Sequence, residues 1–156
     1  MPSILFVCSA NQCRSPMAEV LFEALLEEKG VREEWRVESA GVWAYDGARA
    51  TGNAQTVMAE RKLNLDDHRS QLADPALLEQ FDLIVVMTGV HKDVLQEHNP
   101  ALAERILTIR ELAGGSGDFD DPVGGSEEVY RHAADELEKI LVESYVQIKA
   151  LIEQGG

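Results

Sequence analysis

Residues 4–26 read ILFVCSANQCRSPMAEVLFEALL, and this stretch decides the fold. The apolar run at 4–7 ends in a turn and is typical of a fully buried strand in a parallel sheet. After Pro16 the apolar residues recur at helical spacing as far as Gly30, where a helix ends naturally. Both cysteines of the chain, Cys8 and Cys13, lie in the turn between this strand and this helix.

The rest of the chain alternates strand and helix patterns in the same way. Residues 35–40, 82–87 and 105–109 read as strands, while 53–62, 75–80, 88–99 and 126–151 read as helices, and 114–126 is a loop rich in glycine and aspartate. Strands that alternate with helices form a parallel sheet covered on both faces. We therefore predict one α/β domain over residues 1–156, a three-layer sandwich with a four-stranded parallel sheet.

The composition limits which binding partners and which cellular compartment we expect for the chain. The chain has 28 acidic and 14 basic side chains, a formal net charge of −14, which opposes binding to nucleic acid or to an anionic membrane. An anionic substrate would need a local positive site. Two cysteines make no disulfide framework, and the apolar run at 4–7 is too short for a signal peptide or a membrane span. These features predict a cytoplasmic protein.

The turn after the first strand has the chemistry of an oxyanion site. Backbone N–H groups, the positive end of the helix and Arg14 converge on Cys8, which favours its thiolate form. The same amides form a concavity for an anion, and the guanidinium offers two parallel donors to phosphoryl oxygens. No nucleotide-binding G-x-x-x-x-G-K-[ST] or G-x-G-x-x-G motif occurs here. The Cys-x5-Arg spacing alone is weak, because a structural cysteine and a surface arginine can fall at this distance by chance.

The segment VCSANQCRSPMAE at 7–19 resembles the phosphate-binding loop of the low-molecular-weight protein tyrosine phosphatases. The resemblance extends through SAGV at 39–42, DDHRSQ at 66–71, DLIVVMTGVH at 82–91 and DPVGGS at 121–126, so it covers nearly the whole chain. It implies hydrolysis of phosphorylated proteins through a phosphocysteine, with phosphate or other oxyanions in the site and without a metal or other cofactor.

The resemblance and the positions of the residues in the chain together give expectations for individual residues. Asp121 of the Asp-Pro motif is the expected general acid, whereas Asp118 and Asp120 are expected to be solvated. Ser15 is expected to donate to the Cys8 sulfur, although a plain helix N-cap is also open. The substrate is expected to be bound by the loop residues Ser9, Ala10, Asn11, Gln12 and Cys13, and Ser39 and His68 are expected to support Asn11. Trp43 and Tyr45 are expected to line the substrate cleft. The rings of His91, His98 and His132 are expected to face solvent.

Asn11 and Cys13 each allow a further interpretation. Asn11 tolerates a left-handed backbone better than most residues, which a tight cradle requires. In the family, the second loop cysteine can form a reversible disulfide with the nucleophile, so Cys13 is a candidate redox partner of Cys8. A small apolar filler is the other interpretation of Cys13, and the sequence leaves both open.

The sequence favours phosphotyrosine as the substrate and leaves phosphoarginine as an alternative. Val123 and Gly124 follow the Asp-Pro motif where tyrosine-directed members usually carry aromatic residues. The segment DPVGGSEEVY resembles a bacterial subgroup that includes protein-arginine phosphatases, but Gln12 stands where that subgroup has a small hydroxyl residue. Arsenate reduction needs further cysteines for its disulfide relay, and the chain has none. A non-catalytic oxyanion-binding module would need neither the thiol nor the acid.

Overall fold

The sheet has four parallel strands in the order β2-β1-β3-β4. They are β1 (Ser3–Cys8), β2 (Arg36–Gly41), β3 (Leu83–Val86) and β4 (Ile106–Thr108). In the central strand Ile4 pairs with Val37 of β2 on one side and with Leu83 of β3 on the other. The structure is a computed structural model that describes residues 1–155. It confirms the predicted four-stranded parallel sheet.

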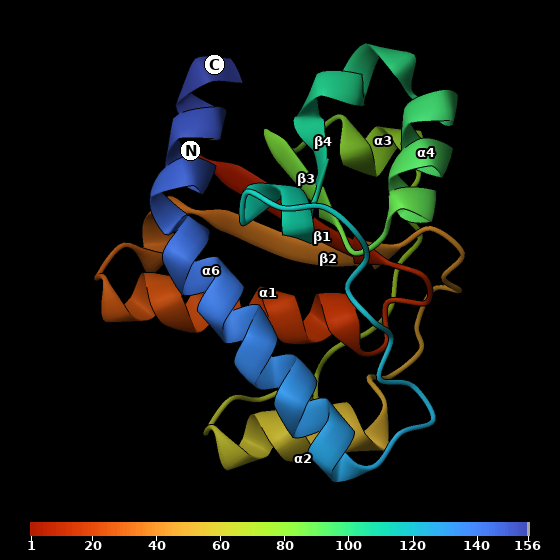
Figure 1. Ribbon diagram of the computed structural model, residues 1–156, viewed down its shortest axis with the longest axis vertical. Coiled ribbons are helices and arrows are strands. Elements are labelled where there is room, and N and C mark those ends of the chain that lie inside the picture. The colour runs from red at the N-terminus through yellow and green to blue at the C-terminus, as the bar shows by residue number, and fades with distance from the viewer. Residues whose placement is uncertain (156) are drawn as a thin grey trace.

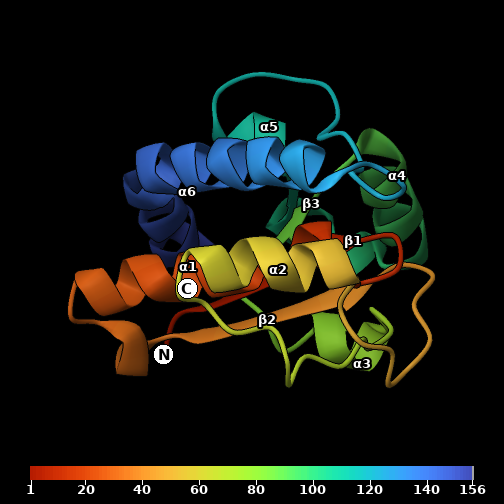
Figure 2. The same cartoon turned by 90° about the horizontal axis from the view of Figure 1, so that it is seen from below.

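Helices cover both faces of this sheet, as Figures 1 and 2 show. One face packs against α1 (Arg14–Glu28), α2 (Gly52–Glu60), α5 (Ile109–Leu112) and the long α6 (Glu127–Gly155). The other face packs against α3 (Pro75–Leu78), α4 (Gly89–His98) and the 3₁₀ helix η2 (Pro100–Arg105). A second 3₁₀ helix, η1 (Arg32–Glu34), leads into β2. The three-layer α/β sandwich predicted from the sequence is therefore present.

The alternation of side chains along β1 builds the two halves of the core. Ile4, Phe6 and Cys8 point into the cluster formed with α1 and α6. Leu5 and Val7 point into the cluster beneath α3 and α4. Both faces of the strand are thus buried, which is why its sequence is continuously apolar instead of alternating with polar residues.

Local hydrogen bonds explain where the observed helices differ from the predicted ones. The first helix begins at Arg14, not at Pro16, because the carbonyl of Cys13 already accepts from the Met17 N–H at 3.0 Å. The prediction missed η1, η2 and α5. The last of these is only one turn long and is closed by a capping box, in which Thr108 and Glu111 satisfy each other's backbone N–H groups.

The strand order brings the turns after β1 and β3 together. The chain leaves β1 for β2 on one side and later returns to β3 on the other, so the carboxyl end of β1 is a topological switch point, where ligands bind in such sheets. Cys8 is the last residue of β1. Among residues 1–155, no helix combines the length and the apolar character needed to cross a bilayer.

Gly41, the last residue of β2, allows the turn after β1 to approach this strand closely. A Cβ atom at this position would lie 2.7 Å from the Ser9 carbonyl oxygen and 2.9 Å from the Asn11 nitrogen, both of which are backbone atoms. We expect Gly41→Ala to lower the free energy of unfolding by about 1–3 kcal/mol. We also expect it to weaken vanadate binding, because the turn must move. Urea unfolding and vanadate titration measure the two effects.

Gly52→Ala is the matched control for this substitution. Gly52 opens α2, and a Cβ there meets no atom within 4 Å. Its unfolding free energy should stay within about 0.5 kcal/mol of the original chain. Equal unfolding and equal vanadate affinity for the two alanine variants would contradict the close-packing argument.

Candidate active site

The predicted nucleophile lies at the floor of the turn between β1 and α1. Cys8 is 2% exposed, and its Sγ lies 3.0 Å from the Oγ of Ser15 in the first turn of α1. The Asn11 side-chain amide donates to the same Ser15 oxygen at 2.8 Å. The Ser15 hydroxyl proton is therefore free to point at the Cys8 sulfur or at the Ala40 carbonyl, 3.3 Å away. As a donor to the sulfur it would stabilise a thiolate.

Asn11 holds the turn from behind. Its backbone is left-handed, with φ of 58°, as its residue type suggested, and its side chain is completely buried. Its amide nitrogen donates to Ser15 and to Ser39 of β2, and its amide oxygen accepts from the Gln71 N–H at 3.0 Å. The His68 Nε2 donates to the Asn11 carbonyl at 2.7 Å. The structure thus places Ser39 and His68 against Asn11.

The hydrogen-bond chain behind the turn ends at a buried carboxyl group. Ser39 accepts from Asn11 and donates to Glu19 of α1 at 2.6 Å. Burial raises the pKa of Glu19 from its usual 4.5 to about 7, and the nearby carboxylates of Glu23 and Glu38 add to the shift. A group that sequence reasoning did not single out therefore titrates near neutral pH, three hydrogen bonds from the Ser15 hydroxyl through Asn11 and Ser39.

Arg14 is a buried cation, and residues 1–155 satisfy only part of the hydrogen-bonding capacity of its guanidinium group. Its side chain is 4% exposed, and Nη1 donates to the Phe119 carbonyl at 2.8 Å. Nη2 lies 3.4 Å from Ser9 Oγ and 3.4 Å from Asp121 Oδ2. Among residues 1–155 the buried Nε–H has no hydrogen-bond acceptor. Because an unpaired buried guanidinium N–H is costly, this edge of the fork is suited to an oxyanion.

The loop between α5 and α6 brings Asp121 to this arginine. The loop is fixed by the Phe119 N–H, which donates to the Met87 carbonyl at the end of β3 at 2.8 Å. Asp121 remains 38% exposed, so its carboxyl group can reach both Arg14 and solvent. Asp118 is exposed but accepts from the Gly89 N–H at 2.8 Å, and so it ties the loop to α4. Asp120 is exposed.

The predicted wall residues lie at the rim of the turn. Trp43 is 56% exposed, and its backbone N–H donates to the Ser9 carbonyl at 2.9 Å, whereas the Tyr45 side chain is 87% exposed. Ala10 is also exposed. The Gln12 side chain donates to the Arg49 carbonyl at 3.1 Å, which joins the turn to the loop before α2.

His91 was expected to face solvent, and this expectation is wrong. The ring is 2% exposed, and its Nε2 lies 2.8 Å from Ser9 Oγ, beside Arg14. It also packs edge-on against Trp43, with ring centroids 5.9 Å apart. Burial, together with the charge of Arg14, lowers the pKa of His91 from 6.5 to about 4, so the ring is neutral. His91 lies in the first turn of α4, directly after β3, and no sequence signal indicated its burial; His98 and His132 are exposed, as expected.

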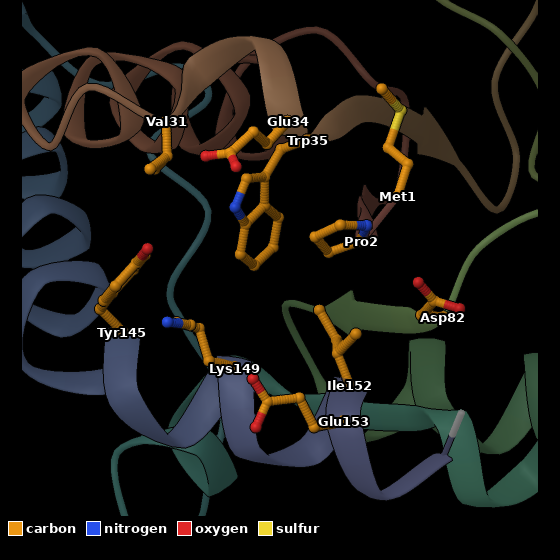
Figure 3. Close-up of a pocket in the computed structure, with 10 residues that line it drawn as sticks. All are labelled: Met1, Pro2, Val31, Glu34, Trp35, Asp82, Tyr145, Lys149, Ile152 and Glu153. Atoms are coloured by element: carbon orange, nitrogen blue, oxygen red, sulfur yellow. The ribbon is translucent and has the colours of Figure 1, made fainter.

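A separate pocket of about 490 Å³ lies at the opposite, amino-terminal ends of the strands. Figure 3 shows Trp35 at its centre, between side chains of α6 and the first residues of the chain. None of the predicted site residues lines this pocket. The chemistry of the turn and this pocket are therefore at different ends of the sheet.

Comparisons with known proteins agree with this geometry. A family model described as low molecular weight phosphotyrosine protein phosphatase matches residues 3–154. A protein-arginine-phosphatase of Bacillus subtilis (strain 168) is 38% identical over 147 residues, which cover 94% of this chain and 96% of that protein. The low molecular weight protein-tyrosine-phosphatase PtpB of Staphylococcus aureus is 30% identical over 146 residues, 89% of this chain and 94% of that protein.

A solved structure extends the similarity to three dimensions. It is a mutant of the YwlE arginine phosphatase with a phosphorylated active-site serine. It superimposes with a TM-score of 0.89 at 36% identity, over 94% of this chain and 95% of that one.

The raised pKa of Glu19 predicts a pH-dependent stability. A carboxyl group whose pKa is higher in the folded state takes up a proton on folding between about pH 4.5 and 7, so its contribution to stability falls as the pH rises through that interval. Relative to Glu19→Gln, the original chain should lose on the order of 3 kcal/mol between pH 5 and pH 8. Urea unfolding at the two pH values measures this.

Glu28→Gln, at an exposed position of the same helix, is the control. Its unfolding free energy should follow the original chain at both pH values. If Glu19→Gln shows the same pH dependence as Glu28→Gln, the buried carboxyl group does not behave as described.

Proposed function

The chain belongs to the low molecular weight phosphotyrosine protein phosphatase family, and on this premise we propose that it hydrolyses phosphotyrosine on proteins through a phosphocysteine at Cys8. The family's enzymes are cysteine-dependent phosphatases. The observation that carries the proposal is the buried Arg14 guanidinium beside Cys8, whose Nε–H has no acceptor within residues 1–155 and whose Nη2 lies 3.4 Å from Asp121. A nucleophile, an oxyanion clamp and an acid are the parts that phosphoryl transfer to a thiolate needs.

In the first step the Cys8 thiolate attacks phosphorus, and the bond to the leaving oxygen breaks as the S–P bond forms. Backbone N–H groups of residues 9–13 and the Arg14 fork hold the phosphoryl oxygens. Asp121 gives its proton to the leaving oxygen, because a phenolate leaves poorly without one. In the second step water attacks phosphorus while Asp121 takes one of its protons, and the S–P bond breaks to release inorganic phosphate. Ser15, 3.0 Å from Cys8 Sγ, then donates to the departing sulfur.

Phosphoarginine is the second candidate substrate. The B. subtilis relative is named a protein-arginine-phosphatase, and its likeness to this chain covers nearly all of both proteins. The loop after Asp121 presents only Val123, which is 60% exposed, and no aromatic ring. One feature disfavours phosphoarginine. Gln12 stands where the arginine-directed subgroup has a small hydroxyl residue, and its side-chain amide donates to the Arg49 carbonyl instead. Trp43 and Tyr45 are proposed to contact the planar phenyl ring instead.

The reversible disulfide between Cys8 and Cys13 stays a prediction. Both cysteines are free and buried. With a peroxide as oxidant, Cys8 would become a sulfenic acid and Cys13 would displace its hydroxyl group as water. We place this chemistry, and the enzyme, in the cytoplasm, where thiols are kept reduced and the disulfide can be reversed.

A comparison of two substrates tests the proposed function. We expect a phosphotyrosyl peptide to give the higher kcat/KM, and a phosphoarginyl peptide of the same sequence the lower. Cys8→Ser serves as the blank, since it keeps the turn but lacks the thiolate. A higher kcat/KM for the phosphoarginyl peptide would select the second candidate. If neither peptide is hydrolysed above the blank, the phosphatase proposal fails.

Asp121→Asn tests the general acid. The amide cannot give a proton to the leaving oxygen, so turnover should fall on the order of 100-fold or more, whereas inorganic phosphate should still inhibit competitively. Asp120→Asn, in the same loop, is the matched control and should turn over like the original chain. Unchanged turnover in Asp121→Asn would rule out this assignment.

A further inference from the structure

The side chain of Cys13 faces the proposed general acid. Cys13 is the N-cap residue of α1, yet it makes no side-chain capping bond. A hydroxyl or carboxylate oxygen at this position normally accepts from the helix backbone, whereas a thiol is a weak acceptor. The side chain is 6% exposed, and its Sγ lies 3.4 Å from Asp121 Oδ1, within the range of a hydrogen bond to sulfur.

Cys13 is a protonated thiol, and so it can act as a donor. Burial, together with the nearby Cys8 and Asp121, raises its pKa from 9.0 to about 12. A protonated thiol attacks another sulfur slowly, so the predicted Cys8–Cys13 disulfide would form only after Cys13 loses this proton. Its S–H, in contrast, has a carboxylate oxygen as a partner. The same contact that suppresses the thiolate thus directs the proton at Asp121.

The two oxygens of Asp121 have different surroundings. Oδ1 accepts from the Val123 N–H at 3.0 Å and from the Cys13 thiol. Oδ2 lies 3.4 Å from Arg14 Nη2, on the side of the phosphate-binding fork. Oδ2 accepts one bond, from the Arg14 Nη2 that a bound phosphoryl group would also engage, whereas Oδ1 carries two donors, so the proton of a neutral Asp121 is directed to Oδ2. This is the oxygen that faces the site where phosphorus would be bound.

The Val123 N–H by itself fixes the Asp121 carboxyl group only relative to its own loop. It belongs to the same loop as Asp121, so it moves with the acid, and Val123 is exposed. Cys13 lies at the start of α1, on the opposite side of the contact. The thiol is therefore the donor that ties Oδ1 to a rigid element.

We propose that Cys13 is a positioning residue for the general acid: its S–H donates to Asp121 Oδ1 and aims the protonated Oδ2 at the leaving oxygen. This inference rests on the proposed function, in which Asp121 protonates the leaving group. The proton that moves comes from Asp121; the Cys13 proton stays on sulfur throughout. The substitution of Cys13 should then slow those reactions that need the acid and spare those that do not.

Leaving groups of different basicity test this role. We compare kcat/KM for phenyl phosphate, whose phenolate needs a proton, with kcat/KM for p-nitrophenyl phosphate, whose phenolate leaves readily without one. Cys13→Ala and Cys13→Ser leave nearly the same space, and they differ in a hydrogen-bond donor. We expect Cys13→Ala to lower the phenyl phosphate value about tenfold relative to the p-nitrophenyl phosphate value. Cys13→Ser should restore most of this ratio.

All assays contain a thiol reductant. Urea unfolding shows that each variant is folded, and inhibition by inorganic phosphate shows that the phosphate-binding turn between β1 and α1 is intact. A capping bond from the new serine would change stability but not the ratio between the two substrates. Equal ratios for Cys13→Ala and Cys13→Ser, or an equal loss on both substrates, would overturn the proposal, because a packing role predicts either result.

Asp121→Asn, measured on the same two substrates, separates this inference from the function on which it rests. It should raise the preference for p-nitrophenyl phosphate more than Cys13→Ala does. If Asp121→Asn shows no such preference, the general-acid assignment itself fails. If Asp121→Asn shows it and Cys13→Ala does not, the acid stands and only the role of Cys13 is wrong.

Discussion

The hydrogen bonds of the Asn11 side chain hold the active turn in a conformation that its backbone would otherwise leave. A non-glycine residue with a φ of 58° is strained by about 1 kcal/mol or more. The buried amide offsets this by joining Ser15 of α1, Ser39 of β2 and the backbone of Gln71. Each bond connects the turn to a different segment of the chain. The position of Cys8 relative to Ser15 depends on all three, since a shift of any one would rotate the amide away from the Ser15 hydroxyl.

The strand order decides which other segments can reach this turn. Because β1 lies between β2 and β3, the backbones after all three strands converge at one edge of the sheet. The Trp43 N–H donates to the Ser9 carbonyl from one side. On the other side Met87 accepts from the N–H of Phe119, which lies in the loop between α5 and α6 that carries Asp121, here called the acid loop. Phe119, in turn, is buried and accepts from Arg14 through its carbonyl. The acid loop is thus attached to the sheet and to the cradle through adjacent atoms, which brings Asp121 to Arg14 across more than a hundred residues of sequence.

The sequence predicted the parts that local chemistry determines. The buried strand, the Cys8 turn, the helix after it and the left-handed Asn11 each follow from residue types within a few positions. Asp121 could be chosen among three loop aspartates only through the family resemblance, because a loop aspartate carries no local mark of catalysis. The burial of His91 and the contact between Cys13 and Asp121 could not be predicted, since both depend on how α4 and the acid loop fold over the turn. The one-turn α5 was missed because its capping box stabilises a helix too short for an apolar period to be read.

The burial of Arg14 explains how so acidic a chain can attract an anion. The formal net charge is −14, yet the guanidinium is 4% exposed, so its field is screened less by water than that of any surface charge. In the unliganded site Asp121 balances part of this charge through Oδ2. A phosphoryl dianion at the Nε edge would repel an ionised Asp121, and this repulsion is relieved when the carboxyl group takes up a proton. In the proposed mechanism, the binding of the substrate therefore favours the protonated Asp121 that the first step would require, and transfer of this proton to the leaving oxygen would return Asp121 to the form that can accept a proton from water.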